Sequence, residues 1–301
     1  MLKYVELKFQ SFYNEVDSIK LFGALIDAYS NLYNDLKEFI NKFENNKILI
    51  SSLFPKEKDV FLFPKPILNL DKKFISGDKK EKLEKIKFIK AFKKLKYISK
   101  KELEKILNEG KYSKEILEDF YKIFKNNQDK LEYKFKSIEI PRVTINRITS
   151  SSKIFYESGK ILENNHSLFF LVKYEDEEDF EKIVNCLKLL EDRGISPNIS
   201  VGFGKFKLIA CDNFFINSDG DKKYLLSKTS LDKGDNLESN SLYSLKEIKG
   251  FSSNSYYIPP NLFLVEGSCI SGRINGQIIK IPNENSIRYL LYGKPLFFGC
   301  N

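Results

Sequence analysis

The stretch SLFFLVKYEDEEDFEKIVNCLKLLEDRGISPNISVGFGKFKLIA, residues 167 to 210, decides the fold because it contains a strand, a helix, a glycine loop and a second strand in that order. Its first eight residues form a compact apolar strand. Apolar residues then recur at helical spacing behind an acidic run that suits a helix N-terminus, and Gly194 stands where a C-terminal glycine cap belongs. After the loop, Phe206, Leu208 and Ala210 alternate as in a half-buried strand.

The glycine loop is a candidate binding element, but it is not a dinucleotide site. In a Rossmann fold or a P-loop the glycines follow a strand and open a helix, whereas Gly202 and Gly204 follow a helix and precede a strand. Such a loop can still let a nucleic-acid backbone approach main-chain amides closely, with Lys205 beside it. The alternative is a tight turn or β-bulge with a purely structural role.

A second informative stretch, IPRVTINRITSSSKIF at 140 to 155, indicates a basic hairpin. Pro141 disfavours a helix before it, β-branched residues favour strands, and serines 150 to 152 suit the turn. It holds two of only five arginines in a chain with 45 lysines, and a guanidinium grips a phosphate or stacks on a base better than an ammonium does. The hairpin is therefore a candidate RNA-gripping arm, or else an amphipathic hairpin with solvated arginines. The arm residues would be Arg142, Thr144, Asn146, Arg147, Ser152 and Lys153.

Together with other segments, these two stretches resemble a known family. The chain is similar to the RAMP superfamily of CRISPR proteins and, within it, to subunit four of the type III-A (Csm) effector complex. The other segments that carry the resemblance are SIKLFGALIDAYSNLY (18 to 33), LISSLFP with FLFPKP (49 to 66) and the closing YGKPLFFG (292 to 299).

The resemblance implies a non-catalytic subunit without a cofactor. It would bind the repeat-derived five-prime handle of the CRISPR guide RNA. Its protein partners would be the large polymerase-like subunit and the backbone RAMP subunit, which it would bridge. Arg273 and Arg288, in the C-terminal part of the chain, could reach phosphates from the other side, although each could equally form a surface salt bridge.

Composition sets outer limits. The 301 residues suit one long or two ordinary domains, and 42% hydrophobic residues are enough for real cores. No apolar run approaches the roughly 20 residues that span a bilayer, so a cytoplasmic protein is expected. Four scattered cysteines without a C-x-x-C pair suggest neither a zinc site nor a disulfide framework, so no metal is expected.

Positive charge is concentrated in one segment. Residues 71 to 136 hold 21 lysines against 12 acidic residues, an excess that equals the +9 net charge of the whole chain. Helical spacing of Leu83, Ile86, Ile89 and Phe92, and of later apolar residues, predicts a helical insertion. Its lysines could attract RNA without sequence preference or bind an acidic protein partner, or they could form an ordinary solvated face.

The predicted fold class is α+β, with two ferredoxin-like (RRM-type) halves. Residues 1–211 form the first half, with the helical insertion at 71–136 and the basic hairpin at 138–157. Its other elements are a strand at 2–9, a helix capped by Asp17 or Ser18 and running through Leu36, and strands near 48–53 and 60–64. Residues 212–301 form a second, degenerate, β-rich half. The aromatic RNP motif of RRM domains is missing, so base stacking on the sheet is not expected.

Enzymatic functions find little support. The only histidine, His166, lies in a polar turn ahead of a strand, and no motif supplies it with a catalytic partner. The main alternative function is a metal-independent, repeat-processing endoribonuclease of the same superfamily, but those enzymes carry their glycine loop nearer the C-terminus. A third possibility is a purely structural assembly subunit that does not contact RNA.

Overall fold

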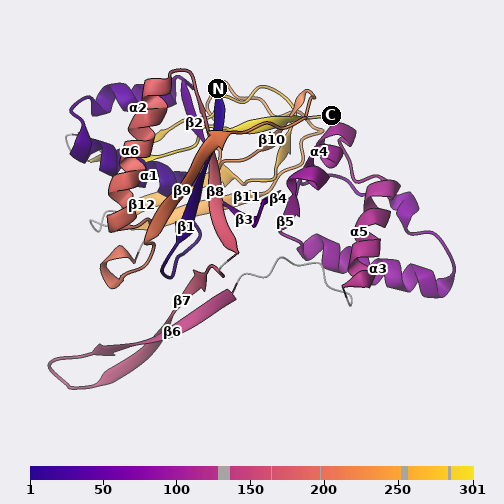
Figure 1. Cartoon of the computed structure of the whole chain (residues 1–301), viewed down its shortest axis with the longest axis horizontal. Helices are drawn as coiled ribbons and strands as arrows, with labels where there is room; N and C mark the ends of the chain where they lie inside the picture. Colours follow the sequence, from indigo (N-terminus) through magenta and orange to yellow (C-terminus); the bar gives the residue numbers. More distant parts are fainter. Residues whose placement is uncertain (128–135, 164, 197, 252–256, 284–285) are drawn as a thin grey trace.

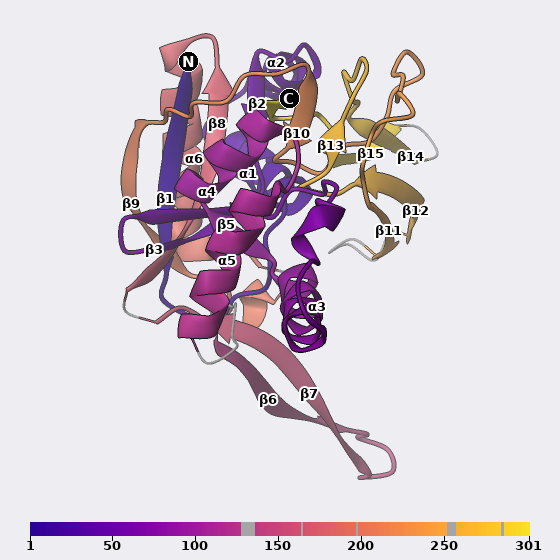
Figure 2. The ribbon, with the colours of Figure 1, turned by 90° about the vertical axis from the view of Figure 1, so that its right-hand side faces the viewer.

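A computed structural model describes residues 1–127, 136–163, 165–196, 198–251, 257–283 and 286–301. The fold is α+β, with six α-helices and several antiparallel sheets among these residues (Figure 1). One large sheet is covered by helices on one face, a helical insertion lies to one side of it, and a two-stranded hairpin projects from the body (Figures 1 and 2).

The large sheet has the strand order β5-β4-β3-β8-β1-β9, and β2 also pairs with β8. All of its pairings are antiparallel. The elements of this sheet and its covering helices are β1 (Leu2–Phe9), α1 (Ser18–Leu32), α2 (Leu36–Glu44), β2 (Ile48–Ile50), β3 (Phe54–Glu57), β4 (Val60–Pro64), β5 (Tyr97–Ser99), β8 (His166–Tyr174), α6 (Glu177–Arg193) and β9 (Phe206–Asn213).

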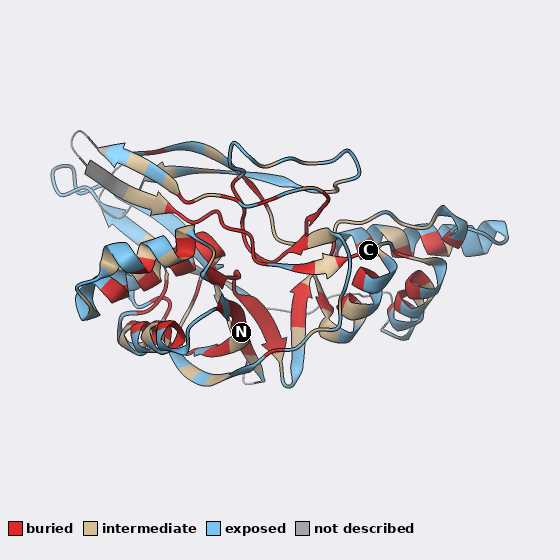
Figure 3. Cartoon of the chain, turned by 90° about the horizontal axis from the view of Figure 1, so that it is seen from above, coloured by how far each residue is buried: buried red, intermediate tan, exposed pale blue. Residues whose placement is uncertain are grey.

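Strand β8 is central because both of its faces are buried. Leu168, Phe170 and Val172 pack in the core beneath α1, α2 and α6. Phe169 and Leu171 point to the opposite face, into a second core shared with the insertion and the C-terminal part. This explains why the sequence of β8 is a continuous apolar run instead of an alternating one. Figure 3 shows the buried residues concentrated along these central strands.

Helix α1 begins as predicted but ends earlier. The Asp17 side chain caps it by accepting from the Lys20 N–H at 3.0 Å. The predicted helix through Leu36 is wrong, because α1 stops at Leu32 and a separate helix, α2, follows. The Tyr29 ring stacks on Phe39 of α2, with 3.8 Å between ring centroids, and this contact folds α2 back against α1.

The insertion is helical, as predicted, with an additional strand. It contains η1 (Lys72–Phe74), α3 (Lys79–Lys94), α4 (Lys100–Glu109) and α5 (Lys114–Asn126), while β5 joins the edge of the large sheet beside β4. The predicted apolar side of α3 is partly wrong. Phe88 and Phe92 are buried against aromatic rings of η1 and α5, whereas Leu83 and Ile86 are 56% and 40% exposed.

The C-terminal part is β-rich, as predicted. Its three-stranded sheet has the order β13-β10-β16, and two further hairpins pair β11 with β12 and β14 with β15. No α-helix occurs among residues 212–301 that the structure describes. The strands are β10 (Lys222–Leu225), β11 (Leu245–Phe251), β12 (Tyr257–Leu264), β13 (Cys269–Ile270), β14 (Ile279–Asn283), β15 (Ser286–Leu291) and β16 (Phe297–Cys300).

Candidate nucleic-acid interface

A hairpin lies where the sequence predicts the basic hairpin at 138–157, and its two strands are longer than predicted. Strands β6 (Lys136–Ile145) and β7 (Ser152–Ile161) pair in unbroken antiparallel register and extend away from the body (Figures 1 and 2). Near the base, Tyr13 and Lys160 exchange main-chain hydrogen bonds of 3.0 and 2.8 Å. The hairpin is thus attached near its base, and its outer part is open to a ligand.

The hairpin has one polar face and one apolar face. Residues directly opposite in an antiparallel pair share a face. Arg142 faces Phe155 and Thr144 faces Lys153, so three of the predicted binding residues lie side by side. The other face carries four apolar side chains, each more than half exposed, and Ser152. The apolar members are Val143, Ile145, Ile154 and Tyr156.

The hairpin tip presents Arg147. The Asn146 carboxamide oxygen accepts from the N–H groups of Ile148 at 2.9 Å and Thr149 at 3.2 Å, so this side chain shapes the turn. Arg147 is exposed and has no ion pair within the described ranges. Arg142, by contrast, is half-buried, and its Nε lies 3.1 Å from the Glu157 carboxylate. Arg147 is therefore the arginine of this hairpin whose charge is available to a phosphate.

The glycine loop uses its main-chain donors inside the protein. The N–H of Gly202 donates to Ile199 O and that of Gly204 to Phe12 O, while the N–H of Lys205 donates to Ser11 Oγ. The expectation that these amides are open to an RNA backbone is therefore wrong for the loop in this conformation. The arrangement is a tight turn, and the exposed Lys205 side chain remains available to RNA.

Gly204 itself is required by packing. It is buried with φ +81°, and a Cβ there would lie 2.6 Å from Ile195 O. Gly202 also has a positive φ, +86°, but nothing lies within 4 Å of a Cβ added to it. Of these two glycines, only Gly204 is required by a close approach of neighbouring atoms.

The glycine loop and the base of the hairpin are in contact. A Cβ added to Gly159 of β7 would lie 2.9 Å from the Phe203 ring, which also packs against Phe12 with 5.5 Å between centroids. The two stretches that sequence reasoning singled out therefore meet at the base of the hairpin.

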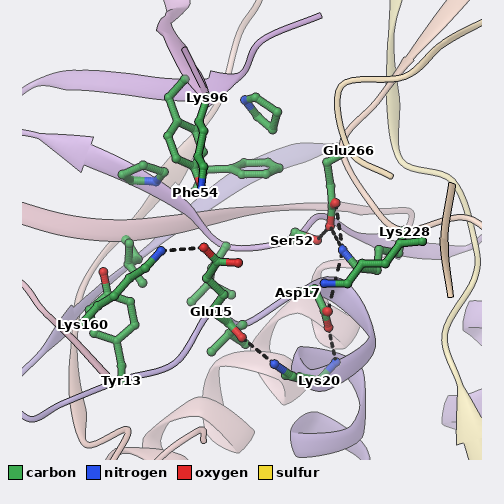
Figure 4. Close-up of a pocket in the computed structure, with 17 residues that line it drawn as sticks. Tyr13, Glu15, Asp17, Lys20, Ser52, Phe54, Lys96, Lys160, Lys228 and Glu266 are labelled. Atoms are coloured by element: carbon green, nitrogen blue, oxygen red, sulfur yellow. Dashed lines mark hydrogen bonds and ion pairs between the residues drawn. The ribbon is translucent and has the colours of Figure 1, made fainter. Parts of the chain in front are cut away.

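A cavity of about 210 Å³ opens beside this base (Figure 4). Its charged lining holds five lysines and three carboxylates, and two tyrosines and Ser52 add polar groups. It was not foreseen, because its walls come from segments far apart in the sequence. The charged lining residues are Glu15, Asp17, Lys20, Lys96, Lys160, Lys228, Lys246 and Glu266, and the tyrosines are Tyr13 and Tyr97.

One wall of the cavity is a buried ion cluster. The Lys228 ammonium lies 3.0 Å from the Glu266 carboxylate and 3.7 Å from that of Asp17, and only 6% of its side chain is exposed. Burial alone would lower the pKa of Lys228, but the charges of Glu266 and Asp17 outweigh it and raise this pKa. The cluster joins the N-terminus of α1 to the C-terminal part of the chain. The charges of Lys228, Glu266 and Asp17 are thus committed to the fold.

The remaining cavity lysines differ in their partners. Lys160 Nζ lies 2.6 Å from Glu15, and Lys20 donates to the Glu15 main-chain oxygen at 2.8 Å. Lys96 and Lys246 are exposed and have no ion pair within the described part of the chain. These two ammonium groups give the cavity mouth its excess positive charge.

Other predicted residues lie elsewhere. Arg273 is exposed in a separate groove, lined also by Lys222, Lys223 and Glu238, which shares no residue with the cavity. Arg288 belongs to β15, but its side chain lies outside the described residues. His166 begins β8 and is half-buried there, instead of lying in a turn.

No group of three potential metal-ligating side chains was found in the described ranges. All four cysteines are free, and three of them are buried. None of the helices in the described residues is long and apolar enough to cross a membrane.

The chain is similar in sequence to CRISPR proteins of the Csm4 family. Residues 218–300 match the family model described as CRISPR Csm4 C-terminal domain. The CRISPR system Cms protein Csm4 of Methanocaldococcus jannaschii is 28% identical over 313 residues, which cover 89% of this chain and 82% of that protein. The protein of the same name from Thermococcus onnurineus is 25% identical over 193 residues, covering 62% of this chain and 60% of that protein.

Solved structures share the fold over its whole length. A chain in the crystal structure of a Csm3-Csm4 subcomplex of the type III-A CRISPR-Cas interference complex is 22% identical, with a TM-score of 0.67 and 99% of both chains covered. A chain in the crystal structure of a Csm1-Csm4 cassette in complex with cA4 is 18% identical, with a TM-score of 0.68, covering 99% of this chain and 98% of that one. At these identities the likeness establishes the fold.

Proposed function

The chain belongs to the Csm4 family of CRISPR proteins, and we propose that it is a non-catalytic, guide-RNA-binding subunit of a type III-A interference complex. The observation that carries the RNA-binding proposal is the projecting hairpin. It places Arg142, Thr144 and Lys153 on one face and presents at its tip Arg147, which has no ion pair among the described residues; the cavity with its five lining lysines lies at the base of the hairpin.

The hairpin is suited to grip an RNA backbone and to separate neighbouring nucleotides. Its polar face offers hydroxyl, ammonium and guanidinium donors to phosphates. Its exposed apolar face, which includes Val143 and Ile154, can lie against base faces that would otherwise stack on each other. The cavity at the base then receives the continuing backbone near Lys96 and Lys246. The bound segment would be the five-prime handle of the guide.

The protein partners follow from the relatives. Solved structures pair Csm4 with Csm1 in one case and with Csm3 in the other. This chain would contact the counterparts of both, and it would thereby bridge the large subunit and the backbone subunits. A cytoplasmic location is part of the same proposal.

We also propose that the chain consists of two ferredoxin-like units. Strands β9, β1, β8 and β2, with α1 and α6 between them in sequence, follow the β-α-β-β-α-β order of a ferredoxin-like unit. Residues 1–211 would be this unit, with the insertion and the hairpin as additions. Residues 212–301 would be a second, degenerate unit that has kept strands but no helix in the described ranges.

Arg147→Ala should weaken RNA binding and leave the fold intact, because the side chain is exposed and has no described ion pair. We expect a several-fold loss of affinity for single-stranded RNA, and a log–log salt slope about 0.7 lower for each lost phosphate contact. Fluorescence anisotropy at several salt concentrations measures both. Arg142→Ala should cost less, since Glu157 already neutralises Arg142.

Arg193→Ala is the matched control for this prediction. It removes the same charge from the C-terminus of α6, where Arg193 pairs with Asp27 at 3.3 Å. Unchanged affinity and slope in both hairpin variants, or an equal loss in Arg193→Ala, would remove the hairpin from the RNA site.

The purified protein should leave labelled repeat RNA and target RNA uncut, with or without divalent metal. His166 is half-buried at the start of a strand and outside the cavity lining, so it is poorly placed to promote attack by a 2′-OH. The measurement is a cleavage time course with His166→Ala alongside. Site-specific cleavage that disappears in the variant would favour the endoribonuclease. Cleavage that survives in the variant indicates a contaminating ribonuclease.

A further inference from the structure

The outer face of α3 carries an unusual excess of positive charge. Six exposed lysines fall within about 140° of the helix circumference, at 100° per residue. We call this set the α3 lysine face. Its members are Lys79, Lys82, Lys87, Lys90, Lys93 and Lys94.

These lysines lack the acidic neighbours that normally accompany lysines on a solvated helix. The two acids of α3 are engaged elsewhere, Glu81 with the buried Lys85 at 2.7 Å and Glu84 with Lys125 of α5 at 3.1 Å. No member of the α3 lysine face has an ion pair within the part of the chain that the structure describes. Like charges three and four residues apart, as in Lys90 and Lys94, destabilise a helix. Repulsion among the lysines of this face therefore lowers the stability of α3.

Helices α4 and α5 of the same insertion provide an internal comparison. Lys105 and Lys122 both lie within 4 Å of Asp119, and Lys114 lies 3.6 Å from Glu118. A general richness in lysine would have affected all three helices alike. Lysines without an ion pair among the described residues are thus concentrated on α3, where their charge would attract an anionic ligand.

The α3 lysine face continues the proposed RNA site. Two residues after α3 ends, the Lys96 side chain lines the cavity, together with Lys160 from the hairpin base. Figure 2 shows α3 and the base of the hairpin both in the lower part of the molecule, whereas Figure 1 shows the outer part of the hairpin projecting away from the insertion that contains α3. Because Lys96 follows Lys94 by only two residues, an RNA strand that leaves the cavity past Lys96 would next come near Lys93 and Lys94.

A further lysine lies at this end of α3. Lys65 is half-buried, and its ammonium donates to the main-chain oxygen of Phe92. Burial and then the charge of Lys93 lower the pKa of Lys65 to about 8. A polyanion bound across this end of α3 would relieve that unfavourable charge.

We propose that the α3 lysine face binds the phosphate backbone of single-stranded RNA that extends from the hairpin and its cavity, an inference that rests on the proposed function. The contacts carry no sequence preference, because lysines present point charges and no arginine occurs on α3 to fork onto a base. Two exposed apolar residues within the same arc, Leu83 and Ile86, would instead suit an acidic protein partner, so the experiment includes that outcome.

The test uses the full chain carrying Lys87→Gln, Lys90→Gln and Lys94→Gln. The matched control carries Lys105→Gln, Lys114→Gln and Lys122→Gln, which removes the same net charge from α4 and α5. Fluorescence anisotropy measures binding of oligouridylate of about 24 nucleotides, which exceeds the site size of a typical single-strand-binding groove, and of about 6 nucleotides, which lies near the lower end of that range. Circular dichroism checks that both variants keep the helix content of the parent chain.

We expect the α3 variant to bind the long RNA about tenfold more weakly, with a log–log salt slope lower by about 2, or 0.7 for each of three contacts. The short RNA should bind the variant as it binds the parent chain. An equal loss in the matched control, or no loss for the long RNA, would overturn the inference. Unchanged RNA affinity with weaker association to a Csm1 or Csm3 counterpart would also overturn it, in favour of an acidic protein.

Arg147→Ala in the same assay separates the two proposals. If this variant weakens binding of both RNAs while the α3 variant weakens neither, only the role of α3 fails. If the parent chain binds neither RNA, the proposed function fails, and the role of α3 fails with it.

Discussion

Gly204→Val should destabilise the fold by about 2–6 kcal/mol. Overpacking at a tight site costs roughly 1–3 kcal/mol, and a β-branched residue held at positive φ adds roughly 1–3 kcal/mol. Both penalties apply here, because φ is +81° and a Cβ would lie 2.6 Å from Ile195 O. Urea denaturation monitored by circular dichroism measures the loss as a lower midpoint.

Gly202→Ala is the matched control for the glycine loop. Its φ is also positive, but open space surrounds the added Cβ, so only the backbone penalty of about 1–2 kcal/mol is expected. Lys205→Ala should lower RNA affinity without changing stability, since this exposed lysine is the group of the loop that is open to RNA. A Gly204→Val protein with the urea midpoint of the parent chain would show that the loop is not the tight turn described.

Lys228→Met should cost about 3 kcal/mol of unfolding free energy, because it leaves two largely buried carboxylates without their counter-ion. Only 13% of the Glu266 side chain and 16% of the Asp17 side chain are exposed. The double variant Lys228→Met with Glu266→Gln should recover part of the loss, since one of the two uncompensated charges is gone. Urea titrations of the parent chain, both single variants and the double variant complete the cycle.

The Lys228 contribution also has a defined pH dependence. Its pKa is raised in the folded protein, so the folded state holds the proton more tightly than the unfolded chain does. The stabilisation is complete below the ordinary lysine pKa of 10.5 and is lost as the pH rises through the higher folded value. The difference in unfolding free energy between the parent chain and Lys228→Met should therefore become smaller in strongly alkaline buffer. Two results together would mean that the three charges do not interact. The losses of unfolding free energy in the two single variants would add in the double variant, and the difference in unfolding free energy between the parent chain and Lys228→Met would not change with pH.

Local sequence was a good guide wherever neighbouring residues decide the outcome. The β6-β7 hairpin, β8, α6 and β9 all appear where alternation, helical spacing and caps placed them. Gly194 ends α6, and Asp17 caps α1, because capping depends on hydrogen bonds within a few residues. The clustering of Arg142, Thr144 and Lys153 on one face likewise follows from the two-residue period of a strand.

Long-range packing decided what local patterns could not. The side of α3 that faces inward was set by Phe88 and Phe92 meeting the rings of η1 and α5, which left Leu83 and Ile86 outside. Strand β5 forms because its three residues pair in antiparallel register with β4. Neither the inward side of α3 nor the pairing of β5 could be derived from local periodicity, since each depends on residues distant in sequence.

The candidate site shows the same division. Its composition could be anticipated, because scarce arginines in a β-branched segment point to a basic hairpin whatever the rest of the chain does. Its geometry could not. The loop amides turned inward because Phe12 O and Ser11 Oγ were there to accept them, and the cavity took its walls from segments as far apart as Tyr13, Lys96 and Glu266. Local interactions select the elements, but which donors and charges remain free depends on the partners that folding brings from elsewhere in the chain.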